Sequence, residues 1–413
     1  MGISVLGVAG VLIIKPPASL IAQEAPPPAK TSASNQVVNS KLVTANTKLS
    51  FKLFSEILKK QPNENIFISP ASASIALAMT YNGANGETQQ SIAKTLELQG
   101  MSLQEINQAN AALKETLENP DPSVKLNIAN SLWTGEGRPF KAEFIQNMKG
   151  FYKAEVKNLN FGDSSTPSII NAWAKQHTQG KINEIVEEQE IDKNTVFVLV
   201  NAIYFLGTWT EPFSKEATKD SPFTKLDGTI KQHPMMFQQM SEVQYSRNEL
   251  FRAISLPYGG KRLSMYIFLP HKEIGLQTFY ENLNAENWQK WISKFNNYNK
   301  KDVTEELYVG LPRFKLEYSI KLNDTLKALG MEIAFTKNAD FSAMTPQPVS
   351  LSFVKQKTFL DVNEAGTEAA AVTAMGSTRS ASEPMIVNRP FFFAIRDNQT
   401  GTILFMGSIV EPM

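Results

Sequence analysis

The chain has 413 residues, of which 42% are hydrophobic and 20% charged, a composition typical of a soluble globular protein with one large domain or two or three ordinary ones. Its 41 basic and 40 acidic residues give no reason to expect nucleic acid or a membrane surface as a partner. The absence of cysteine excludes disulfides, thiolate metal sites and a thiol nucleophile.

An apolar run at residues 3–14 suits the core of a signal peptide and is too short to span a bilayer. No Lys or Arg precedes the run, although the leading region of a signal peptide normally carries one. We expect residues 1–24 to be a signal peptide and the protein to be secreted or periplasmic, with a cytoplasmic location as the alternative. Residues 25–42 are rich in Pro, Ser and Asn and predict a linker, so the folded domain is expected at 43–413.

The first half of the chain is mainly helical in its hydrophobic spacing. Residues 49–58 predict an amphipathic helix that ends before Pro62. A second helix, expected from Pro70 to about Gly83, is apolar on all sides and is therefore predicted to be buried. Further helices are predicted at 87–98, 103–117, 140–151 and 168–179.

The strongest strand pattern is at residues 195–205, whose continuous apolar character indicates a central strand covered on both faces. Between 221 and 270 the pattern changes to short strands, with Gly259-Gly260 as a hairpin turn. Other strands are predicted at 126–133, 351–362, 391–396 and 402–409, and other helices at 277–294 and 320–329. Helices gathered early and strands later, without regular alternation, indicate an α+β protein.

A segment of mostly small residues, 364–380, follows the predicted strand at 351–362. When it is read with a period of two, one face is uncharged and mostly small until Arg379. The residues of that face are Thr367, Ala369, Ala371, Thr373, Met375 and Ser377. Such a segment suggests bait that a protease cuts and a sheet then absorbs. The alternative, a flexible surface loop whose alternation is accidental, remains open on this segment alone.

Several motifs together resemble the serpin family from about residue 44 to Pro412. They are Asn65-Ile-Phe-Ile-Ser-Pro-Ala-Ser, Tyr81-Asn-Gly-Ala-Asn-Gly-Glu-Thr, Leu199-Val-Asn-Ala-Ile-Tyr-Phe, Leu311-Pro-Arg-Phe and Phe405-Met-Gly. The most specific motif, Val362-Asn-Glu-Ala-Gly-Thr-Glu-Ala-Ala-Ala, is similar to the hinge of inhibitory serpins and precedes Asn388-Arg-Pro-Phe. The resemblance implies a fold of about nine helices and three β-sheets with an exposed reactive-centre loop.

The resemblance also implies a mechanism. A serine protease would be acylated by the loop, which would then insert into the central sheet and trap the protease, so the native state would be metastable. The protein would be a monomer that is not an enzyme and needs no cofactor. No nucleophile elbow or metal-ligand spacing accompanies its three histidines, His177, His233 and His271, which we interpret as surface or structural residues.

Three groups of residues match positions that matter in the family. The hinge, where insertion would begin, comprises Glu364, Gly366, Thr367, Glu368, Ala369, Ala370 and Ala371. The sheet-opening site comprises Trp209, Arg313 and Glu364, although an ordinary surface ion pair is the alternative reading of its two charges. The shutter cluster, beneath the centre of the sheet, comprises Ser69, Ser72, Asn201 and Gln356. The family commonly has His where this chain has Gln356.

Two counts place the reactive bond differently. Counting forward from Gly366 by the commonest family spacing gives Ser380-Ala381, whereas counting back from Asn388 gives Arg379-Ser380. Arg379 would attract trypsin-like proteases, and Ser380 suits elastase-like enzymes with small pockets. We prefer Arg379 because it ends the register that could enter a sheet.

A non-inhibitory binding protein or chaperone of the same fold is the main rival interpretation. A hinge with bulky, charged or Pro residues on its inward face would favour that rival. The inward hinge residues here, Thr367, Ala369 and Ala371, are small and uncharged, which favours an inhibitor.

Overall fold

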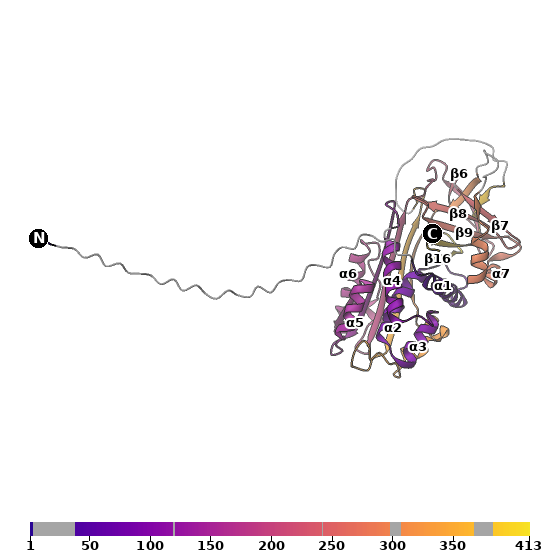
Figure 1. The fold of residues 1–413 in the computed structure, drawn as a ribbon. Coiled ribbons are helices and arrows are strands. Elements are labelled where there is room, and N and C mark those ends of the chain that lie inside the picture. The colour runs from indigo at the N-terminus through magenta and orange to yellow at the C-terminus, as the bar shows by residue number, and fades with distance from the viewer. Residues whose placement is uncertain (3–37, 119, 242, 298–306, 367–382) are drawn as a thin grey trace. The chain divides into compact units, whose positions relative to one another are not determined.

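Three β-sheets and nine α-helices make up the described part of the protein in its computed structural model (Figure 1). The structure describes residues 1–2, 38–118, 120–241, 243–297, 307–366 and 383–413. Apart from the first two residues, these ranges belong to one unit that begins at Val37. The predicted α+β class, with about nine helices and three sheets, is confirmed.

The five-stranded sheet has the strand order β12-β13-β4-β2-β3. The bounds of these strands, in the same order, are Phe314–Lys321, Leu351–Val362, Phe197–Gly207, Val124–Gly135 and Glu155–Leu159. β4 lies in the middle and all of its residues are buried, which confirms the predicted central strand. Its neighbour β13 pairs with it in parallel, from far along the chain.

The other two sheets contain the remaining strands. The seven-stranded sheet, β1-β16-β15-β9-β8-β7-β10, comprises Ile66–Ile68, Ile403–Ile409, Phe391–Asp397, Leu263–Pro270, Phe251–Tyr258, Gln244–Arg247 and Asn296–Asn297. The four-stranded sheet, β14-β11-β6-β5, comprises Met385–Ile386, Leu307–Pro312, Ile230–Met240 and Lys219–Thr224. The predicted turn at Gly259-Gly260 joins β8 to β9, and the φ of +45° at Gly259 explains the need for glycine there.

The helices surround these sheets (Figure 1). They are α1 Ser40–Lys60, α2 Pro70–Gly83, α3 Gly86–Thr95, α4 Leu103–Glu118, α5 Ala142–Asn147, α6 Thr166–His177, α7 Gly275–Asn282, α8 Ala285–Ile292 and α9 Asn323–Leu326. The start of α2 is fixed by its sequence, because the Ser69 hydroxyl accepts a hydrogen bond from the Ser72 N–H and Pro70 occupies the first turn. Nearly every residue of α2 is buried, as predicted.

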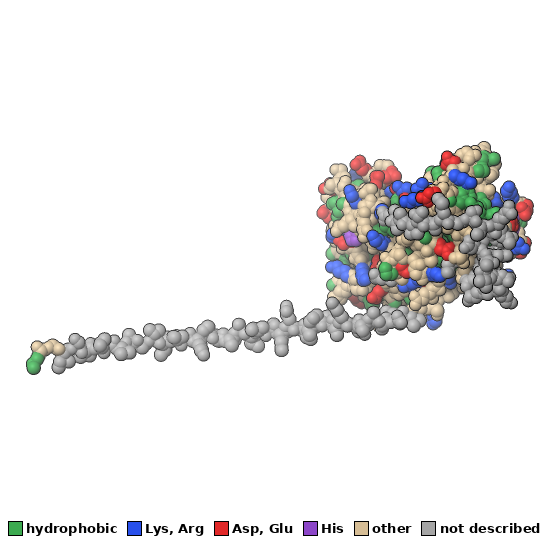
Figure 2. All heavy atoms as spheres, turned by 90° about the horizontal axis from the view of Figure 1, so that it is seen from above, with side chains coloured by type: hydrophobic (Ala, Val, Ile, Leu, Met, Phe, Trp, Pro, Cys, Tyr) green, Lys and Arg blue, Asp and Glu red, His purple; other side chains and the backbone are tan. Residues whose placement is uncertain are grey.

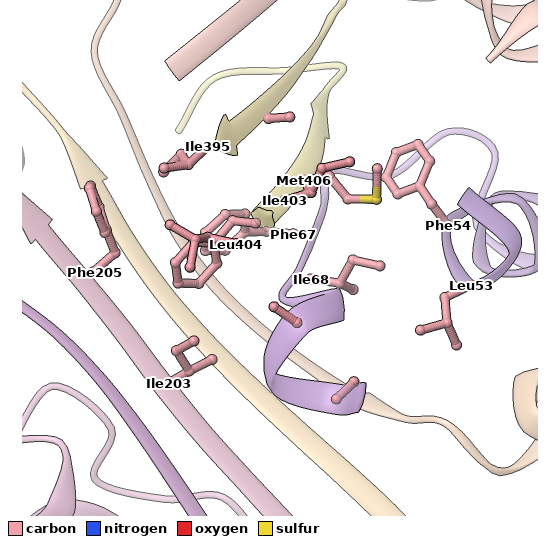
Figure 3. Close-up of a cluster of buried hydrophobic side chains, with 14 of the residues drawn as sticks. Leu53, Phe54, Phe67, Ile68, Ile203, Phe205, Ile395, Ile403, Leu404 and Met406 are labelled. Atoms are coloured by element: carbon pink, nitrogen blue, oxygen red, sulfur yellow. The ribbon is translucent and has the colours of Figure 1, made fainter. Parts of the chain in front are cut away.

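Two apolar clusters pack on opposite faces of the five-stranded sheet. Alternate residues of β4 contribute to each, with Ile203 in the larger cluster and Tyr204 in the smaller. Figure 3 shows part of the larger cluster, with labelled side chains from α1, β1, β4, β15 and β16. The smaller cluster joins the sheet to α6, where the rings of Trp133 and Trp173 lie 6.1 Å apart edge to face. The central sheet is therefore enclosed from both sides.

Some elements differ from the sequence predictions. α1 begins at Ser40, well before the predicted helix at 49–58, because the Asn39 side chain caps it there. The predicted helix at 277–294 is two helices, α7 and α8, separated by a new cap at Asn284. The predicted helix at 320–329 is wrong in its first two residues, because these belong to the edge strand β12.

Charged side chains of both signs are interspersed over the described face in Figure 2. This distribution agrees with the nearly equal numbers of basic and acidic residues in the sequence. No helix among the described residues is long and apolar enough to cross a membrane.

Candidate functional site: the seam between β4 and β13 and the stem of the loop

The chain that leaves β13 turns immediately at residues 363–366. The Asn363 N–H donates to the Gly366 carbonyl at 2.8 Å, and the Gly366 N–H donates back to the Asn363 carbonyl at 3.1 Å. Gly366 has a φ of +130°, a conformation that other residues rarely adopt. The chain after β13 thus reverses direction within four residues.

This turn lies against the end of β4. Gly366 forms a bridge with Thr208, and the Trp209 N–H donates to the Ala365 carbonyl at 3.0 Å. A Cβ on Gly366 would lie 2.1 Å from the Gly207 carbonyl oxygen, so the contact needs glycine for space as well as for φ. We call residues 363–366 the stem of the loop, and the line along which β4 and β13 pair the seam. The stem therefore begins at the end of the seam where both strands end.

The predicted sheet-opening residues meet at this turn. Glu364 is 5% exposed and accepts a hydrogen bond from the Thr218 hydroxyl at 2.7 Å. Its other carboxylate oxygen lies 3.5 Å from Arg313 Nε, in a side chain that is half exposed. Trp209 donates from its ring nitrogen to the Asn363 carbonyl at 3.0 Å. The structure thus brings together the three residues that the resemblance named.

The predicted shutter cluster also assembles, beneath the middle of the seam. Gln356 on β13 lies opposite Asn201 on β4, and its amide nitrogen donates to the Asn201 side-chain oxygen at 2.7 Å. Gln356 also exchanges two hydrogen bonds with the backbone of Ser69, each 3.0 Å long. Asn201 donates to the Ser72 hydroxyl at 2.5 Å. The amide thus makes the hydrogen bonds that link the two strands to the start of α2.

Sequence reasoning missed three polar residues of these sites. Asn130 on β2 accepts from Asn201 at 2.6 Å, and Thr358 on β13 donates to the Phe67 carbonyl at 2.7 Å. Thr218 was the third, through its bond to the Glu364 carboxylate. Asn130 and Thr358 lie in strands that contain several other polar residues, and Thr218 lies in a segment without a distinctive pattern, so none of the three has a specific signal.

The rest of the predicted loop lies outside the described residues. This applies to five hinge residues, Thr367, Glu368, Ala369, Ala370 and Ala371, and to the reactive-bond residues Arg379, Ser380 and Ala381. On the far side of this gap, the Glu383 carboxylate lies 2.8 Å from Arg252 on β8. Arg252 also donates to the carbonyls of Glu383 and Pro384, at 3.2 and 2.8 Å.

The histidines have backbone partners in the described structure. His177, His233 and His271 each place a ring nitrogen within hydrogen-bond distance of a backbone carbonyl oxygen, at 2.9, 2.5 and 2.9 Å. Among the described residues, no group of three His, Cys, Asp or Glu side chains could hold a metal ion. The assembled groups at the seam are amides, hydroxyls and an ion pair.

Comparison with known proteins identifies the family. The family described as "Serpin (serine protease inhibitor)" matches residues 44–412. Human Serpin B3 is 37% identical over 394 residues, covering 90% of this chain and 99% of its own length. The horse leukocyte elastase inhibitor is 36% identical over 383 residues, with the same coverage of both chains. The chain therefore belongs to the serpin family, whose described function is serine protease inhibition.

Solved structures agree with this assignment. Tengpin, a thermophilic serpin in its native state, has a TM-score of 0.83 and 32% identity, covering 92% of this chain and 96% of its own. Human thyroxine-binding globulin complexed with thyroxine has a TM-score of 0.80 and 29% identity, covering 91% of this chain and 99% of its own. The fold thus occurs both in a thermophilic serpin and in a protein that binds thyroxine.

Proposed function

We propose that this protein is a suicide-substrate inhibitor of serine proteases. The protease serine oxygen attacks the carbonyl carbon of Arg379, an ester forms, the bond to Ser380 breaks, and Ser380 leaves with a new amino group. The released loop then enters the central sheet between β4 and β13. The bound protease is carried along before water can hydrolyse the ester. Cleavage between Ser380 and Ala381 is the alternative position.

The observation that carries this proposal is the direction of the strands at the seam. β4 and β13 run parallel and are neighbours, and the chain leaving β13 turns back above the end of β4. A strand that descends from Gly366 between them would run antiparallel to both. Two antiparallel ladders would then replace one parallel ladder, whose pairing is slightly less stable per residue.

The energy of this rearrangement is considerable. Each residue added to the sheet gains backbone hydrogen bonds with a net value of about 1 kcal/mol, so about a dozen residues release roughly 10 kcal/mol. The native state is therefore metastable in this proposal. From Glu364 to Arg379 the extended chain reaches roughly 50 Å, enough to carry a protease to the far end of the sheet.

The proposal also covers the oligomeric state, the target proteases and the location of the protein. The protein acts as a monomer without a cofactor, and trypsin-like proteases are its preferred targets, with elastase-like proteases as the alternative. Residues 1–24 direct its export, so it meets its targets outside the cytoplasm. The likeness to thyroxine-binding globulin supports a second candidate, a non-inhibitory binding protein in which the loop stays passive.

Covalent trapping provides the test. Incubation with trypsin, and separately with elastase, is expected to give a complex that survives boiling in SDS, while sequencing of the released C-terminal fragment identifies the reactive bond. A Thr367→Arg variant places a charge on the inward register and is expected to be cleaved without trapping. Its matched control is Glu368→Arg, whose side chain falls on the outward register. Clean cleavage of the unaltered protein without any complex favours the passive binding protein.

A further inference from the structure

The segment between α6 and β4, residues 178–196, runs along the outer face of β13. The Lys357 ammonium donates to the Glu184 carbonyl at 2.7 Å, and near the end of the segment the Val196 N–H donates to the Ser352 hydroxyl at 2.9 Å. The contacts therefore descend β13 while the segment advances towards β4. We call residues 178–196 the strap.

The strap also connects the two sides of the seam. It leaves α6, which packs on β2 through the smaller apolar cluster, and it ends where β4 begins at Phe197. Between these points it bonds to Asn171 on α6, on one side of the seam, and to Lys357 and Ser352 on β13, on the other side. Any strand that enters between β4 and β13 must pass beneath the strap.

The Glu190 carboxylate connects the strap to β13 and β12 through two lysines. Glu190 lies 2.7 Å from the ammonium of Lys355 on β13 and 3.0 Å from that of Lys321 on β12, through the same oxygen. The side chains of Lys355 and Glu190 are only 9% and 11% exposed, whereas Lys321 is 43% exposed. A charge pair that is this largely buried is costly to break, because each partner is left poorly solvated without its counter-ion.

The register of β12 and β13 places two lysines side by side, and the Glu190 carboxylate compensates for their charges. Lys321 and Lys355 are direct partners in the antiparallel pair of β12 and β13. Like charges directly opposite each other destabilise a sheet. Glu190 compensates for both of them, and it does so from a segment that is covalently continuous with β4.

Insertion of a strand separates the two anchors of the strap. Neighbouring strands lie about 4.8 Å apart, so an added strand moves β13 away from β4 by about that distance. Glu190 is joined to β4 through the short stretch 191–196, while its charge partners move with β12 and β13. A contact of 2.7 Å is then lost unless the strap itself lifts or stretches.

We propose that Glu190 is a positioning residue which clamps the strap across the seam and thereby sets the rate at which the sheet accepts a strand. The inference rests on the proposed function. In the acylated protease, insertion competes with hydrolysis of the ester, so this rate decides how many inhibitor molecules are consumed for each protease trapped. A slower rate also protects the uncut protein from premature rearrangement.

The test measures sheet opening without a protease. A synthetic peptide with the sequence of residues 364–377 is incubated with the full chain, and its incorporation is followed by native gel and by the rise in Tm. Glu190→Gln and Lys355→Met are each expected to accept the peptide about tenfold faster than the unaltered protein, equivalent to about 1.4 kcal/mol of barrier. The double variant is expected to be no faster than the faster single variant, because both changes break one contact.

Two further variants keep the result interpretable. Glu188→Gln removes an exposed carboxylate from the same turn and is expected to leave the rate unchanged. Lys321→Met alters a half-exposed lysine, so it folds even where a change at Lys355 does not, and it is expected to increase the rate by a smaller factor. The rate at which trypsin attacks the loop is expected to be equal in all variants, while the number of inhibitors consumed per trapped trypsin falls in Glu190→Gln.

The outcomes separate the two proposals. Equal peptide rates in all variants, or a lower Tm in Glu190→Gln without a faster rate, overturn the clamp and leave inhibition standing. A chain that accepts the peptide faster on loss of Glu190, but forms no covalent complex with trypsin or elastase, supports the clamp and counts against the proposed function.

Discussion

Replacing Gln356 with methionine tests the shutter cluster most directly, because it keeps the length of the side chain and removes three hydrogen bonds. The Ser69 carbonyl retains a partner, since it also accepts from the Ala73 N–H at 3.0 Å. The Ser69 N–H and the Asn201 side-chain oxygen lose the partners that Gln356 gave them. At about 1.5 kcal/mol for each buried group left without its hydrogen bond, the native state is expected to lose about 3 kcal/mol.

The expected change in Tm follows from the size of the domain. An unfolding entropy of about 2.1 cal/mol/K per residue gives about 0.8 kcal/mol/K for roughly 380 residues, so a loss of about 3 kcal/mol lowers Tm by about 4 °C. Differential scanning calorimetry measures this shift. The matched control is Gln232→Met, the same chemical change at an exposed position of β6, for which no shift is expected.

Measuring the same Tm shift in the loop-cleaved protein shows whether the effect of Gln356→Met depends on the pairing of β4 with β13. In the proposed cleaved state a new strand separates β4 from β13, so Gln356 and Asn201 no longer face each other. The variant is therefore expected to lower the Tm of the uncut protein much more than that of the cleaved protein. An equal loss in both forms would show that the contribution of Gln356 does not depend on the pairing of β4 with β13, and the reasoning about the seam would be refuted.

Three other predictions concern the ends of the loop and the clamp. Gly366→Ala is expected to lower the native Tm by several degrees in calorimetry, because the added Cβ meets the Gly207 carbonyl oxygen and φ is positive; an unchanged Tm would contradict the close approach. Arg252→Ala removes three bonds to residues 383–384, so we expect faster loss of inhibitory activity on storage at 37 °C, with the chain remaining uncut on SDS gels; equal storage lifetimes would exclude this anchor. Burial alone would raise the pKa of Glu190, but hydrogen bonds from its lysine partners and a backbone N–H lower it overall, so its stabilising contribution is complete above the ordinary value of 4.5 and is lost as pH falls through the lower folded pKa. Peptide acceptance is therefore expected to accelerate in acid for the unaltered protein and not for Glu190→Gln, and parallel acid profiles would contradict this.

The sequence predicted elements with a strong single pattern and missed those whose pattern was short or mixed. β4 and α2 were evident because they are covered on all sides, so their apolar residues are continuous. β1 has only three residues, and β12 alternates as an exposed edge strand beside a helix start, so neither has a decisive pattern. Local spacing carries no information on pairing, and the parallel contact of β4 with β13 therefore required either the structure or the resemblance.

Some residues of the candidate site were likewise predicted from the sequence, whereas others were not. The residues of the sheet-opening site and the shutter cluster were named through the family resemblance, and the structure places each group together. Glu190 was not predicted, because its importance depends on two lysines that meet only through strand register. Lys355 had no distinctive signal, because Gln356, Lys357 and Asp361 of the same strand are also polar or charged. No spacing rule connects it to a carboxylate on the strap.

The enclosure of β4 on both faces also limits how this protein can evolve. A segment that enters beside β4 must fit two packed layers, one against α2 and one against the strap, in addition to attracting a protease. In the proposed mechanism, the sheet constrains the size and charge of residues 366–377, whatever protease is encountered. Changes of target specificity are then confined to the few positions around the proposed reactive bond at Arg379 and Ser380, so a lineage of such inhibitors could acquire a new target protease through very few substitutions.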